Sequence, residues 1–459
     1  MKFRLLAALA TLLVCGGLTA VAVASSPDGD RHEQDRSDYE VWLIDQSNTR
    51  GSVAAGNGGY LYIYKEKDLN RNDTAASPEK IDLGGEVSDL CFDKTGTRPT
   101  RPHMVVFNGG NDSSDGSSDA ALAFVASGHV VFFDTETRAP TECIDTGAQA
   151  HAVWPTPDQK HLIVANQNDK KLSRISTDYE TDTFTPEPEA TIDLANGTTP
   201  SGALRQDPAL RPDNAPICPR TDDAGKITFV SLRGGGAFVV DHKVSPMRIV
   251  AEYDKDALHP NGCGYIQKGN NMYANSGAGA LTTNPSEHDV YSLPVDEYST
   301  RRPAPPNTPS PELVYSLDDR GNVDSHGVLL TRRGKYLWVN DRIQNQVQVV
   351  KTRTNERVNE FPLATETATD PAPDLMDISP DKEKVFFAAR GPNPQSGGHA
   401  AFGNSPGLGV IDVKRDGLSG KLDYVARVGN ILDGTEQADP HAVRVRQIPP
   451  PLGGSHTSP

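Results

Sequence analysis

The chain repeats one short unit, in which two apolar stretches flank a polar turn. Residues 151–166, 326–340 and 374–389 share this pattern, and the turn lies at the same offset in each of them. Proline and aspartate in such turns fix the backbone or hydrogen-bond to it locally, which favours a tight reversal. Each unit is therefore predicted to fold as a β-hairpin.

Two further strands follow the hairpin in the better examples. Residues 172–175 and 190–194 follow the first hairpin, and residues 347–350 and 358–363 follow the second. Units of four antiparallel strands that recur roughly every 40 to 60 residues are typical of β-propeller blades. The 41 glycines and 35 prolines suit a turn-rich protein of the all-β class.

The repeat predicts seven inner strands. They begin near His103, His151, Cys218, His259, His326, Asp374 and His441. Residues 439–446 resemble a first strand with no blade after it, and residues 40–45 resemble a second strand with no first strand before it. Joining them closes the ring and removes its open edges. We therefore predict an all-β fold, a seven-bladed β-propeller over residues 39–448, with one blade shared between the N- and C-terminal strands.

This repeat resembles that of a known group. The turn, the Leu-Ile-Val-Ala-Asn strand and the third strand at residues 157–175 are similar to those of the YVTN/YncE-like bacterial propellers. Relatives of that superfamily include lactonase-type propellers and the propeller domain of nitrous oxide reductase. The resemblance extends over nearly all of the predicted propeller and implies its fold. It leaves function open, because the superfamily contains both enzymes and non-enzymes.

The two ends of the chain have a different composition. Lys2 and Arg4 precede an apolar run, and Ala22-Val23-Ala24 has the small-residue pattern of a cleavage site. We expect a signal peptide at residues 1–24, a polar linker at 25–38 and a disordered tail at 449–459. We expect the protein to be secreted, periplasmic or located on the cell surface. We expect it to keep no integral membrane segment after cleavage.

The net charge argues against one class of partner, and the number of cysteines indicates disulfides. The net charge of −16 argues against nucleic acid as a partner. The predicted mature chain keeps four cysteines, an even number that suggests disulfides in an exported protein. Three pairings are open, and proximity in the chain favours Cys91–Cys143 with Cys218–Cys263.

Four of the inner strands open with histidine, any residue and valine. Inner strands surround the central axis, so their first residues form a ring at one mouth of the channel. The predicted ring consists of His103, His151, Cys218, His259, His326, Asp374 and His441. All of these side chains can bind a transition metal, and copper or zinc is the expected cofactor. The resemblance also implies a metal in this ring, because the nitrous oxide reductase propeller carries a histidine-rich copper cluster. Two alternatives stay open: histidines that only stabilise the turns, and a small organic or anionic ligand in the ring.

A second group of polar residues follows the second strands on the same face. Its candidate ligand-binding members are Arg233, Asn166, Asn340, Arg342 and Arg390. Arg233 precedes three glycines, which let a backbone approach a ligand closely, and arginine can clamp a carboxylate or phosphate. The alternative is that the asparagines only form turns.

Together these features predict an exported binding propeller whose histidine-rich mouth holds a metal ion or a small ligand. Two other functions stay open. One is an enzyme, either a copper-dependent oxidase or a lactonase-like hydrolase. The other is a cell-surface or protein-interaction scaffold without a catalytic site. Phosphate-binding loops, nucleophile elbows and zinc-helix motifs are absent from the sequence.

Overall fold

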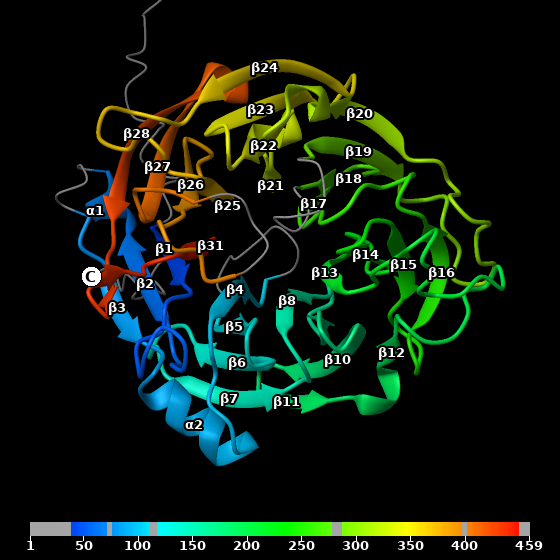
Figure 1. Cartoon of the computed structure of the whole chain (residues 1–459), viewed down its shortest axis with the longest axis horizontal. Coiled ribbons are helices and arrows are strands. Elements are labelled where there is room, and N and C mark those ends of the chain that lie inside the picture. Colours follow the sequence, from blue (N-terminus) through cyan, green and yellow to red (C-terminus); the bar gives the residue numbers. More distant parts are fainter. Residues whose placement is uncertain (1–37, 71–75, 110–116, 278–286, 397–401, 449–459) are drawn as a thin grey trace, which may run out of the picture. The chain divides into compact units, whose positions relative to one another are not determined.

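Seven antiparallel sheets surround a central axis in the computed structural model, which describes residues 38–70, 76–109, 117–277, 287–396 and 402–448 (Figure 1). Blades one and two contain β31 (Pro440–Gln447), β1 (Tyr39–Asp45), β2 (Tyr60–Lys65) and β3 (Glu79–Asp82), then β4 (Pro102–Phe107), β5 (Asp119–Phe124), β6 (His129–Asp134) and β7 (Pro140–Asp145). The all-β seven-bladed propeller predicted from the repeat is confirmed.

The remaining blades follow in chain order. Blades three and four contain β8 (Ala150–Pro155), β9 (His161–Asn166), β10 (Lys171–Asp178), β11 (Thr183–Pro186) and β12 (Ile192–Asp193), then β13 (Pro216–Thr221), β14 (Thr228–Leu232), β15 (Ala237–Asp241) and β16 (Arg248–Tyr253). Blades five and six contain β17 (Tyr265–Lys268), β18 (Asn271–Ser276), β19 (Asp289–Pro294) and β20 (Glu312–Ser316), then β21 (Ser325–Leu330), β22 (Tyr336–Asp341), β23 (Gln346–Lys351) and β24 (Glu356–Pro362). Blade seven contains β25 (Pro373–Ile378), β26 (Lys384–Ala389), β27 (Gly407–Lys414) and β28 (Ser419–Arg427).

Blade one closes the ring as predicted. β31 pairs antiparallel with β1, so that Leu43 lies opposite Val443, and the two ends of the chain complete one sheet. Both faces of β1 are buried: Trp42 packs in a cluster with blade two, and Val41 packs in a cluster with blade seven. A blade buried on both faces explains why its strands read as continuous apolar runs.

The structure also contains helices that the strand pattern does not reveal. The short α1 (Glu66–Leu69) follows β2, and α2 (Glu86–Thr95) follows β3 and ends at Gly96, whose φ of 78° is left-handed. α2 buries Cys91, which is bonded to Cys143 of β7, and a second disulfide joins Cys218 of β13 to Cys263. The favoured disulfide pairing is confirmed, and two disulfides fit an oxidising compartment.

The predicted signal peptide at residues 1–24 and the tail at 449–459 lie outside the described residues, as does the linker at 25–38 except for its last residue. Within the described ranges, no helix is long and apolar enough to cross a membrane.

Candidate metal centre

The inner strands bring most of the predicted ring together at one mouth of the channel. His103, His151, His326, Asp374 and His441 are each the second residue of an inner strand, and all five side chains are buried. The register against the neighbouring strand shifts at each of these positions. A β-bulge of this kind leaves the extra residue outside the ladder and re-aims its side chain. Regular pairing therefore resumes only beyond the ring residue.

His259 is not in this ring, contrary to the prediction. The inner strand of blade five begins at Tyr265, so His259 lies in the loop before it. Gly262 in this loop touches the backbone of Asn275, where a Cβ would lie 1.8 Å from the carbonyl oxygen. Pairing with β18 begins only at Tyr265, opposite Ala274, which is later than the histidine spacing suggests. The His259 Nδ1 atom lies 2.6 Å from Asp289 Oδ2, and this contact raises the pKa of His259 to about 9.

Two carboxylates accompany the displaced histidine. Asp318 Oδ2 lies 3.7 Å from His259 Nδ1, and one donor atom each from His259, Asp289 and Asp318 lie within 4.8 Å of one another. The raised pKa leaves His259 positively charged at neutral pH, so these three residues form an ion-paired group apart from the ring.

Cys218 is not available as a thiolate ligand, which corrects the prediction for this residue. Its sulfur is bonded to Cys263, so the disulfide joins the inner part of blade four to that of blade five. A disulfide sulfur has no thiolate charge with which to bind a metal. The ring of candidate ligands is therefore reduced to four histidines and Asp374.

Each of the four histidines has its Nδ1 atom next to a hydrogen-bond acceptor. His151 Nδ1 lies 2.8 Å from the carbonyl oxygen of Ile217, and His441 Nδ1 lies 2.8 Å from that of His103. His326 Nδ1 lies 2.5 Å from Asp374 Oδ1. These partners only accept hydrogen bonds, so Nδ1 must carry the proton in these three residues.

His103 completes the set through a residue that the repeat does not reveal. Its Nδ1 atom lies 2.8 Å from Gln46 Oε1. The amide nitrogen of Gln46 faces Asp439 Oδ2 at 3.3 Å, which orients the amide oxygen toward the histidine. Gln46 directly follows β1, and Asp439 directly precedes β31. The closure of the ring by the two termini therefore orients a candidate ligand.

Protonation at Nδ1 leaves Nε2 as the lone-pair nitrogen of each neutral imidazole. The Nε2 atoms of His103 and His151 face each other at 3.2 Å, and His441 Nε2 is buried without a hydrogen-bond partner. Two lone-pair nitrogens do not satisfy each other. A tetrahedral metal ion with bonds of about 2.0–2.1 Å would hold two nitrogens about 3.3–3.4 Å apart.

The four rings form one continuous group. His103 stacks on His441 with centroids 3.6 Å apart, and His151 lies edge-on to His103 at 4.4 Å. His326 lies edge-on to His441 at 5.5 Å. One donor atom each from His326, Asp374 and His441 lie within 4.8 Å of one another.

Burial keeps these imidazoles neutral. It lowers the pKa of His151 to about 4, and it lowers the pKa values of His103 and His441 well below the ordinary value. The pKa of His326 is also lowered, first by burial and then by the charge of Arg342. Neutral imidazole is the form that binds transition metals.

Asp374 is ionised and held by arginines. Burial raises the pKa of Asp374, but the neighbouring His326 and His441 and the buried guanidinium groups outweigh this effect, so the pKa lies well below its usual range. Arg390 Nη1 donates to Asp374 Oδ2 at 2.8 Å and also pairs with Asp439 through two nitrogens, at 2.6 and 2.8 Å. Arg342 pairs with Asp324 at 2.9 Å and lies 3.5 Å from Asp374. Both arginines, predicted as ligand-binding residues, are therefore buried in ion pairs within the protein.

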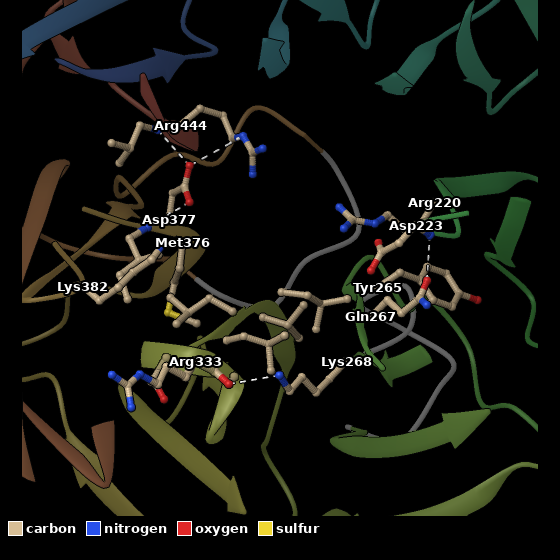
Figure 2. Close-up of a pocket in the computed structure, with 18 of the residues that line it drawn as sticks. Arg220, Asp223, Tyr265, Gln267, Lys268, Arg333, Met376, Asp377, Lys382 and Arg444 are labelled. Atoms are coloured by element: carbon tan, nitrogen blue, oxygen red, sulfur yellow. Dashed lines mark hydrogen bonds and ion pairs between the residues drawn. The ribbon is translucent and has the colours of Figure 1, made fainter. Parts of the chain in front are cut away.

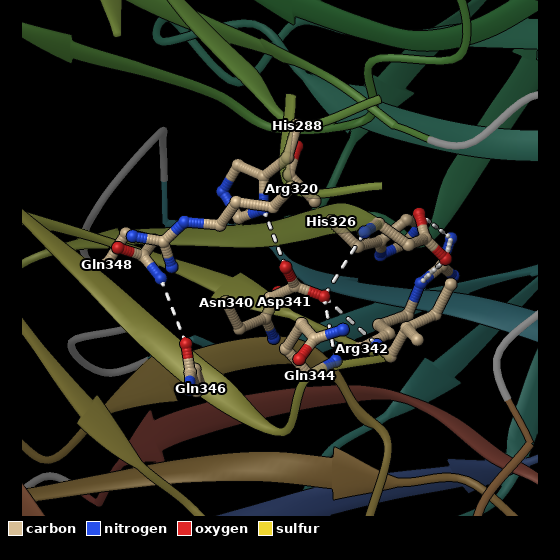
Figure 3. A network of polar contacts seen from close by, with 12 residues as sticks. His288, Arg320, His326, Asn340, Asp341, Arg342, Gln344, Gln346 and Gln348 are labelled. Carbon is tan, nitrogen blue, oxygen red and sulfur yellow. Dashed lines mark hydrogen bonds and ion pairs between the residues drawn. The ribbon is translucent and has the colours of Figure 1, made fainter. Parts of the chain in front are cut away.

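The remaining predicted ligand-binding residues also contact protein atoms. Asn340 accepts a hydrogen bond from the Gly327 backbone at 2.7 Å and donates to the Asp374 carbonyl, which joins blade six to blade seven. Figure 3 shows Arg342 near His326, with Asp341 reaching toward His288 of the preceding blade.

Asn166 and Arg233 form their hydrogen bonds and ion pairs with residues other than the ring histidines. Asn166 bonds to Thr146 at 2.8 Å and to Ser173 at 2.7 Å. Arg233 is partly exposed and pairs with Asp213 at 2.6 Å. The asparagine contacts are those of residues that stabilise turns and strands, and the ligand-binding role of these residues stays a prediction.

The sequence matches no protein family and no curated protein. The fold is similar to solved propellers, among them a periplasmic gluconolactonase from Pseudomonas aeruginosa (15% identity, TM-score 0.52, covering 90% of this chain and 100% of that one). A proposed 6-phosphogluconolactonase from Bacteroides uniformis (13% identity, TM-score 0.54) is covered fully by 89% of this chain. A Lactobacillus plantarum protein (12% identity, TM-score 0.52) has 99% of its length covered by 89% of this chain. At these identities the likeness shows the fold alone, which is a β-propeller, here with seven blades.

Proposed function

We propose that this chain is an exported propeller whose channel mouth binds copper or zinc through the Nε2 atoms of its ring histidines. The observation that carries the proposal is the common orientation of four buried imidazoles. In each, Nδ1 lies next to an acceptor, so Nε2 is left as the donor atom for a metal. Metal-binding histidines have this arrangement, because the outer hydrogen bond fixes the tautomer and orients the ring.

The donor set selects the class of metal. Neutral imidazole nitrogens suit copper and zinc, whereas calcium and magnesium prefer several oxygen ligands. The one carboxylate, Asp374, already contacts His326 Nδ1 at 2.5 Å and accepts a hydrogen bond from Arg390. We assign it the role of a positioning residue, which orients His326 and balances the positive charge of the site. A bound copper ion would supply one-electron chemistry, and a bound zinc ion would polarise an oxygen ligand.

The contacts themselves argue against a purely structural role for the histidines. Joining one blade to the next requires a single hydrogen bond per ring, and Nδ1 already makes it. A structural role gives no reason for His103 and His151 to place two lone-pair nitrogens 3.2 Å apart in a buried site. Leaving His441 Nε2 buried and unpaired costs about 1–3 kcal/mol, which a ligand at this atom would offset.

Metal analysis of the mature chain tests the proposal. We expect copper or zinc to bind after loading and dialysis, and we expect His151→Ala and His441→Ala to lose the metal while still folding. His161→Ala is the matched control, because His161 begins β9 outside the ring. Elemental analysis gives the number of ions, and thermal unfolding without metal reports the fold. The proposal fails if the loaded protein retains no metal, or if the two ring variants retain as much metal as the control.

Export is part of the same proposal. Export is supported by the two disulfides and by the signal-peptide pattern of residues 1–24. A secreted or periplasmic protein would bind its metal outside the cytoplasm. Mass spectrometry of the protein from culture fluid or periplasm tests it, with an N-terminus at Ser25 as the expected result. Protein that stays in the cytoplasm with an intact N-terminus contradicts it.

A further inference from the structure

The opposite mouth of the channel contains a cavity of about 610 Å³ (Figure 2). Its walls are the far ends of the inner strands and the turns that follow them, whereas the histidines lie at the strand starts. Arg444 follows His441 by three residues on β31, a separation of about 10 Å along a strand. The volume is in the range of small-molecule sites.

The cavity is basic although the chain is acidic. Five lining residues are basic and two are acidic, in a protein of net charge −16. The basic residues are Arg220, Lys268, Arg333, Lys382 and Arg444. One of the acidic residues, Asp377, accepts hydrogen bonds from the backbones of Ile378 and Val445, at 2.9 and 2.8 Å, and its Oδ2 atom lies 3.6 Å from Arg444 Nε. The local field therefore favours an anion.

Two of the arginines are held in place by an aromatic ring. The guanidinium carbon of Arg220 lies 4.7 Å from the ring centroid of Trp154, and that of Arg444 lies 5.3 Å from it. Arg220 is buried and Trp154 nearly so, which limits the freedom of both side chains. Figure 2 shows the two guanidinium groups extending toward the open centre of the cavity from β13 and β31. Arginine held by stacking is pre-organised for bidentate binding of a carboxylate or phosphate.

The rest of the wall is apolar. Ile266, Leu330, Met376 and Ile378 line the cavity between the charged residues. A small inorganic anion would leave this apolar surface in contact with water. The combination instead fits a ligand with an apolar body and one anionic end.

We propose that this mouth binds a small organic carboxylate, with the carboxylate between Arg220 and Arg444 and the apolar part against Met376 and Ile378. The proposal is independent of a metal at the other mouth. Binding requires the two arginines to act together, so each should matter more than an exposed lysine such as Lys268.

Benzoate and phenylacetate are suitable probes, with benzamide as the uncharged counterpart and inorganic phosphate as the anion without an apolar body. Titration calorimetry of the full chain should show saturable binding of a carboxylate, none of benzamide, and weaker binding of phosphate. Trp154 fluorescence should change on binding, since Trp154 lines the cavity, whereas Trp42 and Trp338 are fully buried in blades one and six.

Arg444→Gln and Arg220→Gln should each weaken benzoate binding about ten- to one-hundredfold. The matched control is Arg353→Gln, an exposed arginine in the turn between β23 and β24. Lys382→Gln provides a second cavity variant that does not depend on the Trp154 contacts, and it should weaken binding severalfold. The proposal is overturned if neither carboxylate binds saturably, if phosphate binds as tightly as both, or if Arg444→Gln and Lys382→Gln bind like the control.

Discussion

Metal binding at the histidine mouth should displace almost no protons, even in mildly acidic solution. A histidine with the ordinary pKa of about 6.5 is roughly three-quarters protonated at pH 6, so four such ligands would release about three protons. In this protein burial lowers the pKa of His151 to about 4, and the pKa values of His103, His326 and His441 are lowered as well. We therefore expect fewer than about one proton to be released in total at pH 6.

The same reasoning fixes the effect on affinity. Four histidines with ordinary pKa values would weaken zinc binding roughly 200-fold between pH 7.5 and pH 6, because protons compete for every ligand. Buried neutral imidazoles should keep the loss to a few-fold. Titration calorimetry with zinc in two buffers of different ionisation heat gives both the proton count and the affinity. Release of about three protons at pH 6, or a loss of affinity near 200-fold, would refute the idea that burial keeps the ring neutral and ready to bind.

Three further predictions concern stability. The stability of the apo-protein should fall as the pH drops from about 6.5 toward 4, because the folded-state pKa of His151 lies below its unfolded value and the unfolded chain binds more protons in this window. The contribution of His151 is on the order of 3 kcal/mol. Urea unfolding in which His151→Ala shows the same pH dependence as the unchanged protein would contradict this prediction. Replacing Cys218 and Cys263 together by Ser should cost about 4 kcal/mol for a sequence separation of 45, measured by urea unfolding. The protein without residues 1–24, which contain Cys15, should show no free thiol when denatured and labelled, so two reactive thiols would contradict the pairing. Deleting the chain from Ile431 onward removes β31 and should lower the thermal midpoint sharply, because β1 loses its partner strand; an unchanged midpoint would contradict closure by the two termini.

Much of the fold follows from local pattern. The hairpin spacing predicts the blades, and the unmatched strands at residues 40–45 and 439–446 predict the shared blade, because β pairing depends on short apolar runs and turn residues that are visible along the chain. The local pattern does not predict α2, because α2 is a single short helix with few buried side chains, which leaves little periodicity to detect.

The site was only partly predictable. His103, His151, His326, Asp374 and His441 were identified from their place in the repeat, and the structure places them in one mouth. His259 shares the histidine but not the valine two residues later, and it lies before a strand that starts only at Tyr265. A repeat indicates where a strand should begin, but pairing with the next strand decides where it does begin, and Tyr265 is the first residue paired with β18.

By itself, the sequence determined the architecture, the shared blade and the set of histidines at the strand starts, because these depend on the order of short local patterns. Only the tertiary structure decided the state of those histidines. The acceptors for their Nδ1 atoms come from other blades, as with Gln46 beside His103 and the Ile217 carbonyl beside His151. The basic cavity also became visible only in three dimensions, where Arg220 and Arg444, 224 positions apart in the numbering, both lie against Trp154. Tautomer, pKa and charge density depend on distances between atoms far apart in the chain, and folding alone sets those distances.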